Sequence, residues 1–195
     1  MNKKLNAAGL MTLEAYARER EDFRRRVMAH KKNRTVALGK HITLYFEDET
    51  TMRYQVQEML RAERIFEPDA IQEELDAYNP LIPEGSDWRA TMMIEYADPK
   101  VRRVKLAELV GVERTVWARV GDCEKTAAVA NEDLERSTEE KTSAVHFLRF
   151  PLNLKSARAV CAGKPIRVGV AHRNCSEETT LSAPVRKSLV GDINC

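Results

Sequence analysis

The stretch AVHFLRF at residues 144–150 is the most informative strand-like segment of the chain. A β-strand over this stretch puts every second side chain on one face, namely Ala144, His146, Leu148 and Phe150. That face is mainly apolar, so it is predicted to pack against a core. The same alternation carries His146 into the core, where both nitrogens of a neutral imidazole need hydrogen-bond partners. The stretch therefore predicts a sheet with one packed face and a polar group buried in it.

Further strands and helices are predicted on both sides of this stretch. The additional strands are expected at residues 41–46, 88–96, 115–120, 126–130 and 165–172. The helices are expected from Thr12 into a basic run that ends at Arg34, and at residues 52–66, 68–78, 98–110 and 153–162. Strands joined both by hairpins and by helices are typical of an α+β protein. We expect one mixed or mainly antiparallel sheet with helices packed on a face.

The length of the chain suits a single domain. It has 195 residues, and a domain of this size buries about 70% of its unfolded surface. We expect one α+β domain over residues 1–174. Residues 175–195 are rich in polar side chains and have no clear period, so we expect them to form a mobile polar tail that adds little to the core.

Charge and composition argue against several functions. The 32 basic and 30 acidic residues leave a net charge of +2, which gives no overall attraction to nucleic acid or anionic lipid. No apolar stretch is long enough to span a membrane, and the first residues do not form a secretory signal. The four cysteines are scattered, which favours a reduced, cytoplasmic protein over one framed by disulfides. The chain also has no glycine-rich phosphate loop, nucleophile elbow or zinc-ribbon spacing.

The predicted helix at residues 52–66 carries two glutamates of interest. Glu63 follows Val56 by seven residues and lies on the apolar side of the helix. A carboxylate in that position must pair with a cation, coordinate a metal or take up a proton, unless the helix end reaches water. Glu58 lies on the opposite side, where it can pair with Arg61. We predict that Glu63 is largely buried and close to a His, Arg or Lys.

His146 could supply the partner that Glu63 lacks. If the helix and the strand meet, Glu63 or Glu58 lies near His146, and one contact satisfies two buried ionisable groups. Glu63, Glu58 and His146 then form a candidate polar or metal site, for which iron, manganese and zinc are the possible ions. The alternative is that His146 is a core histidine satisfied by ordinary hydrogen bonds.

Two other signals are weaker. The spacing His172-x-x-Cys175 could hold a soft metal, but two ligands are half of a site. The basic run from Arg24 to Arg34 complements the dipole at a helix C-terminus. It could also contact nucleic acid, although no aromatic side chains are interleaved with it.

Four long strings in this chain resemble an uncharacterised bacterial family known as domain of unknown function 3501. The resemblance covers about residues 11–172, and the strings are VALGKHITLYFE, RYQVQEMLRAERI, IQEELDAYNPLIPEG and EEKTSAVHFLRF. The resemblance implies no assigned activity. It does imply a genetic context, because genes of this family often lie beside those for rubrerythrin-like di-iron proteins and iron–sulfur oxidoreductases. That context suggests a role in peroxide handling or electron transfer.

Three hypotheses of function follow. The first is an accessory or adaptor protein of a bacterial redox or peroxide-handling system, which docks on a rubrerythrin-like or iron–sulfur partner. The second is a metal-dependent or proton-transfer enzyme that uses Glu63, Glu58 and His146. The third, with the least support, is a nucleic-acid binder that uses the basic helix end.

Overall fold

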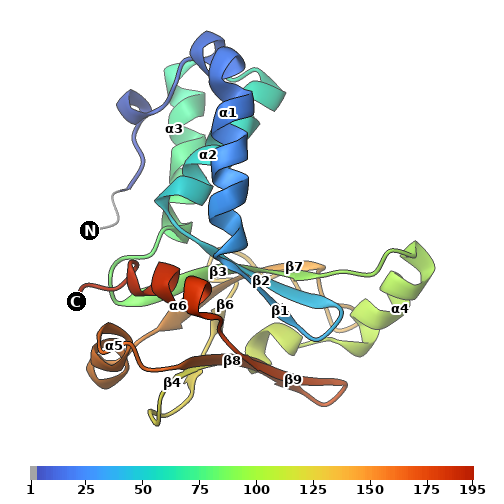
Figure 1. The fold of residues 1–195 in the computed structure, drawn as a ribbon. Coiled ribbons are helices and arrows are strands. Elements are labelled where there is room, and N and C mark those ends of the chain that lie inside the picture. Colours follow the sequence, from blue (N-terminus) through green and yellow to red (C-terminus); the bar gives the residue numbers. More distant parts are fainter. Residues whose placement is uncertain (1–3) are drawn as a thin grey trace.

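The computed structural model describes residues 4–195, and its strands form two antiparallel sheets (Figure 1). The first sheet has the order β1-β2-β3-β7-β6, with the bounds Thr35–Leu38, Ile42–Glu47, Asp87–Ile94, Val145–Pro151 and Val129–Ala130. The second has the order β5-β4-β8-β9, with the bounds Thr126–Ala127, Val116–Val120, Ile166–His172 and Cys175–Thr180. Every strand pairing within the two sheets is antiparallel.

The main core lies between the two sheets. Alternate side chains of the central strands enter it, including Phe46 from β2, Trp88 from β3 and Phe150 from β7. The second sheet contributes Val116, Val168 and other side chains to the same cluster. This arrangement confirms the predicted α+β class and the antiparallel pairing. The strands form two sheets rather than the single one expected, because alternation shows which face of a strand is buried but not which strand lies beside it.

The helices fall into two groups. The helices α1 (Leu13–Lys32), α2 (Glu49–Glu63) and α3 (Pro68–Tyr78) rise together from one end of the first sheet (Figure 1). Around the sheets lie α4 (Pro99–Glu108), α5 (Leu154–Cys161) and α6 (Ala183–Val190), with the short 3-10 turns η1 (Ala7–Gly9), η2 (Asn79–Leu81) and η3 (Val112–Thr115). None of the helices formed by residues 4–195 combines the length and apolar character that a bilayer crossing requires.

Local sequence explains where α2 begins and ends. Asp48 caps its N-terminus: the side chain accepts from the amide of Thr51, and the Thr51 side chain accepts from the Asp48 amide in return. At the other end, Arg64 adopts a left-handed conformation with φ of 56°, which terminates the helix. Met52, Val56 and Leu60 are buried against α3 and the N-terminal segment.

The prediction of a mobile polar tail over residues 175–195 was wrong. Residues 175–180 form β9, which pairs with β8 along its whole length. Beyond it, Leu181, Val185, Leu189 and Ile193 are buried in the main core. The pattern was missed because β9 is a polar strand with no alternation, and because α6 places just two apolar side chains, four residues apart, into the core.

Cysteine chemistry also differs from the expectation. Cys161 and Cys195 form a disulfide with a Cα–Cα distance of 5.5 Å, while Cys123 and Cys175 are free. The bond joins the end of α5 to the C-terminal residues. These two cysteines are 34 positions apart in sequence, so their scattered spacing could not indicate the pairing.

Candidate functional site

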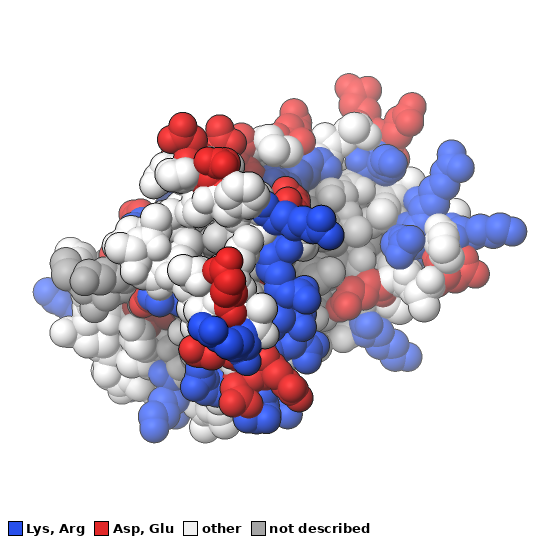
Figure 2. Space-filling view, turned by 90° about the horizontal axis from the view of Figure 1, so that it is seen from above, with Lys and Arg blue, Asp and Glu red and all other residues white. Residues whose placement is uncertain are grey.

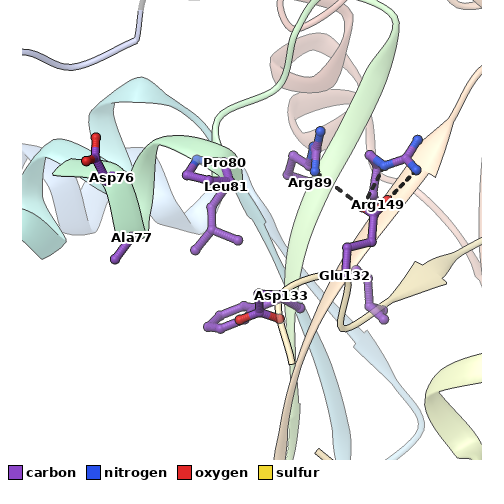
Figure 3. A pocket seen from close by; sticks show the side chains of 10 residues that line it. Asp76, Ala77, Pro80, Leu81, Arg89, Glu132, Asp133 and Arg149 are labelled. Atoms are coloured by element: carbon purple, nitrogen blue, oxygen red, sulfur yellow. Dashed lines mark hydrogen bonds and ion pairs between the residues drawn. The ribbon is translucent and has the colours of Figure 1, made fainter. Parts of the chain in front are cut away.

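A groove runs along the outer face of the first sheet, on the side away from the main core. The C-terminal end of α3 and η2 form one wall, with Pro80 and Leu81, and β3 and β7 form the other (Figure 3). Its cavity volume is about 300 Å³. Phe147 lies on this face because it alternates with the buried His146 and Leu148.

Two arginines and one glutamate mark one side of the groove. Arg89 and Arg149 are directly opposite in the register of β3 and β7, a position in which like charges repel. Glu132 accepts hydrogen bonds from Nε and Nη2 of Arg149 at 2.7 and 2.6 Å. Its carboxylate also lies 3.6 Å from Nη1 of Arg89, so it bridges the two cations (Figure 3). The hydrogen bonds from Arg149 are the main cause that lowers the pKa of Glu132, and they keep this carboxylate charged.

Asp87 holds Arg89 from the other direction. Its Oδ2 is 2.7 Å from Nε of Arg89, an ion-pair contact that is not aligned as a hydrogen bond. The other oxygen of Asp87 accepts from the amide of Glu84. Asp87 is buried and is therefore fixed, whereas the Glu132 side chain is 44% exposed.

An aromatic ring continues the groove beside these charges. The guanidinium of Arg136 stands 4.5 Å from the centre of the Phe147 ring, within the range of a cation–π contact. Arg136 also forms a two-pronged ion pair with Asp133, at 2.5 and 2.6 Å. The groove thus joins an apolar floor to a set of mutually neutralised charges.

The connector, residues 131–144 between β6 and β7, carries Glu132 and is tied to the sheet by a buried polar network. Thr142 Oγ1 lies 2.8 Å from Nε2 of His146 and 3.4 Å from a carboxylate oxygen of Glu113. Ser137 donates to the other Glu113 oxygen at 3.0 Å. Asn131 reaches Nδ1 of His146 at 3.0 Å. Glu113, Thr142 and His146 are each at most 2% exposed.

The network fixes the protonation state of His146. The amide nitrogen of Asn131 is a donor, so Nδ1 of His146 accepts and its proton resides on Nε2. Nε2 then donates towards Thr142 Oγ1 and the carbonyl of Ser143. Burial lowers the pKa of His146, and the nearby Glu113 charge opposes that shift only in part. His146 is thus a neutral core histidine that anchors the connector.

The stability of the fold should fall on acidification because of His146. Since its folded pKa lies below 6.5, the unfolded chain takes up the proton first, and stability is lost as pH falls below about 6.5. Urea unfolding at about pH 7 and about pH 5.5 should show a larger loss for the wild type than for His146→Gln, which retains hydrogen-bonding capacity without titrating. Equal losses in the two proteins would show that His146 is not held neutral.

Glu63, predicted to be buried, is exposed at the last turn of α2. It has no hydrogen bond or ion pair to a His, Arg or Lys of residues 4–195, and it lies near Glu74, whose pKa is raised first by burial and then by Glu63. The prediction was wrong because Glu63, although it has the right angular position on the helix, lies in the last turn, where residues 61–64 are all exposed.

Glu58 and His146 are also not brought together. Glu58 accepts from Tyr16 at 2.5 Å and from Nε and Nη2 of Arg20 at 2.7 Å, so it joins α2 to α1. The partners of His146 come from the connector instead. The proposed Glu63, Glu58 and His146 site is therefore incorrect.

The structure also gives the positions of the other candidate ligands. In the described residues 4–195, no three His, Cys, Asp or Glu side chains are grouped so that they could hold a metal ion. His172 is buried, with Nε2 near the carbonyl of Val110 and Nδ1 near the amide of Asn174, so both of its nitrogens are occupied.

Sequence reasoning missed Arg89, Arg149 and Glu132. A signal was present in the stretch at residues 144–150, because the alternation that buries His146 must place Phe147 and Arg149 on the opposite face. Glu132 had no such signal, since it lies in a charged connector without a period.

Fold and site define an α+β protein of two antiparallel sheets with an open, charge-lined groove on one outer face. The chain belongs to the family described as Protein of unknown function (DUF3501), whose model matches residues 4–193. It is similar to a protein of unknown function from Burkholderia pseudomallei K96243, with 49% identity over 98% of this chain and 100% of that chain, and a TM-score of 0.94. No curated protein matches the chain.

Proposed function

We propose that this protein is an accessory protein that docks on a protein partner through the groove between α3 and the first sheet. The observation that carries the proposal is the pair of directly opposed arginines, Arg89 and Arg149, beside the apolar side chains of Leu81 and Phe147. Opposed like charges weaken a sheet unless a carboxylate lies between them, and the carboxylate that bridges this pair, Glu132, is itself 44% exposed in the groove. Apolar and aromatic contacts next to a few placed charges are the features that protein-binding sites share.

The partner in this proposal is a redox protein. The resemblance to the family implies a gene context of rubrerythrin-like di-iron proteins and iron–sulfur oxidoreductases, and this context supports a role in peroxide handling. We place the complex in the cytoplasm as part of this proposal, although the Cys161–Cys195 disulfide removes the support that the scattered cysteines gave to a reduced compartment.

The other two hypotheses have less support. The enzyme hypothesis requires Glu63, Glu58 and His146 to lie together, but each of these residues has different surroundings. The nucleic-acid hypothesis loses one cation, because Arg34 is buried, and the His30 ring is engaged with Asp48 at 2.6 Å. Acidic side chains also lie among the basic ones on the face that Figure 2 shows, so this face does not carry positive charge alone.

Phe147→Asp should weaken docking on a redox partner by a factor of about ten or more. The substitution removes the aromatic ring from the floor of the groove and places a carboxylate beside the guanidinium of Arg136, so the apolar contact with the partner is lost. Isothermal titration of the purified chain against the rubrerythrin-like protein and the iron–sulfur oxidoreductase of the same organism measures the effect. The matched control is Leu154→Asp, because Leu154 is apolar, 78% exposed and located on α5. Equal affinities for the two variants, or no binding by the wild type, would contradict the proposal.

A further inference from the structure

We infer that the groove recognises a carboxylate of the partner segment, and that Glu132 occupies the place this carboxylate takes. The inference rests on the proposed function for the nature of the occupant, and it adds the chemical group that is recognised. Three features of the groove lead to it.

The first feature is the geometry of the cation pair. Arg149 uses Nε and Nη2 together on one carboxylate, the fork geometry by which arginine selects planar oxyanions. Arg89 presents Nη1 to the same carboxylate. A carboxylate at this point therefore has its charge shared between two guanidiniums, and the two cations no longer repel each other.

The second feature is the origin of that carboxylate. Arg89 and Arg149 are held on the central strands of the sheet, but Glu132 comes from the connector and its side chain is 44% exposed. Asp87, the other acid near Arg89, is buried and has a second hydrogen bond. Of the two acids, Glu132 is the one that can move away from the arginines without leaving its own carboxylate buried and unpaired.

The third feature is the way the connector is anchored. Asn131, directly before Glu132, pairs through its backbone with Phe147 and through its side chain with His146. Ser137 and Thr142 hold the far end of the connector on Glu113. Since these anchors do not involve the Glu132 side chain, that side chain can rotate out of the groove while the connector stays in place.

The occupant that fits is a protein segment with an acidic side chain, or a terminal carboxylate, next to an apolar side chain. The carboxylate takes the position of Glu132 between the arginines, and the apolar side chain lies on Leu81 and Phe147. No covalent step is involved. The exchange conserves charge in the groove, because one carboxylate replaces another.

Sodium hexanoate is a suitable probe, since it combines one carboxylate with an apolar chain. Its affinity can be followed by NMR titration of the full chain, from the backbone amides of β3 and β7. In Glu132→Gln the internal competitor is removed, and the affinity should rise roughly fivefold, as expected for the release of a favourable exposed ion pair. Adding Arg149→Gln to that variant should remove the gain and lower affinity below that of the wild type.

Three comparisons make the result decisive. Glu58→Gln frees Arg20 from an equally two-pronged ion pair, and it should leave hexanoate binding at β3 and β7 unchanged. Hexanamide, which lacks the charge, should bind all variants equally weakly, and inorganic phosphate should bind less tightly than hexanoate. The inference is overturned if Glu132→Gln shows no gain, if Arg149→Gln has no effect, or if hexanamide or phosphate binds as well as hexanoate.

These outcomes are separate from those that test the docking function. A gain in hexanoate affinity without any binding of the redox partners would refute the proposed function and leave carboxylate recognition standing. If partner binding depends on Phe147 but Glu132→Gln does not change hexanoate affinity, the docking function stands and carboxylate recognition is refuted.

Discussion

A chain that ends at Asn174 is expected to lose cooperative folding. The truncation removes β9, which pairs with β8 along its length, together with the buried side chains of Leu181, Val185, Leu189 and Ile193. Four such side chains contribute roughly 1.5–3 kcal/mol each, and their sum is comparable to the whole stability of a typical domain. The deletion also leaves the indole of Trp88 without its acceptor, the carbonyl of Leu189.

Circular dichroism and thermal unfolding of the truncated chain measure this effect. The control is Cys195→Ser, which breaks the disulfide to Cys161 but leaves the strand and helix intact, and it should retain a cooperative transition. A truncated chain that melts within a few degrees of the full chain would show that residues 175–195 do not belong to the core.

Arg34→Met is expected to destabilise the fold by about 3–5 kcal/mol, the cost of breaking a buried ion pair by removing one partner. The Arg34 side chain is 2% exposed and contacts Asp192 at 2.5 Å and Asp48 at 3.3 Å. It also donates to the backbone carbonyls of Phe46 and Glu47. Arg34 thereby joins the end of α1, the edge of α2 and the C-terminal residues, so its loss takes the buried cation away from Asp192 and Asp48 and one donor away from each of the two carbonyls.

Denaturation by urea, at neutral pH, gives the free energy of unfolding for this comparison. The double variant Arg34→Met with Asp192→Asn should regain part of the lost stability. The neutral side-chain amide of asparagine replaces a buried carboxylate whose charge Arg34 had balanced. A single variant that loses less than about 1 kcal/mol would mean that the ion pairs of Arg34 are not part of what holds these segments together.

The buried faces of the strands could be read from the sequence because alternation reports directly on burial. His146, Leu148 and Phe150 lie in the core as predicted, and Phe147 and Arg149 lie opposite them. How the strands divide between two sheets depends on contacts far apart in sequence, such as that between β8 and β4, and alternation carries no information on these.

The site could be predicted only in part. His146 was correctly placed in the core, but its partners Asn131 and Thr142 lie in a connector whose local pattern is that of a charged loop. Glu63 had the expected angular position on α2 and yet is exposed, because the angular position of a side chain does not show whether another element covers it. The groove depends on the register between β3 and β7, which brings Arg89 opposite Arg149. Because this register is set only in the folded sheet, the sequence pattern did not predict the groove.

Hydrogen–deuterium exchange of the full chain, with and without the redox partner that binds it, tests the docking surface most directly. We predict that binding slows exchange in β3, β7, η2 and the connector around Glu132, which together form the groove. Exchange in α4 and α5 should be unchanged. Protection confined to α4, α5 or the exposed side of α1, with none in β3 and β7, would contradict the assignment of the groove as the docking site.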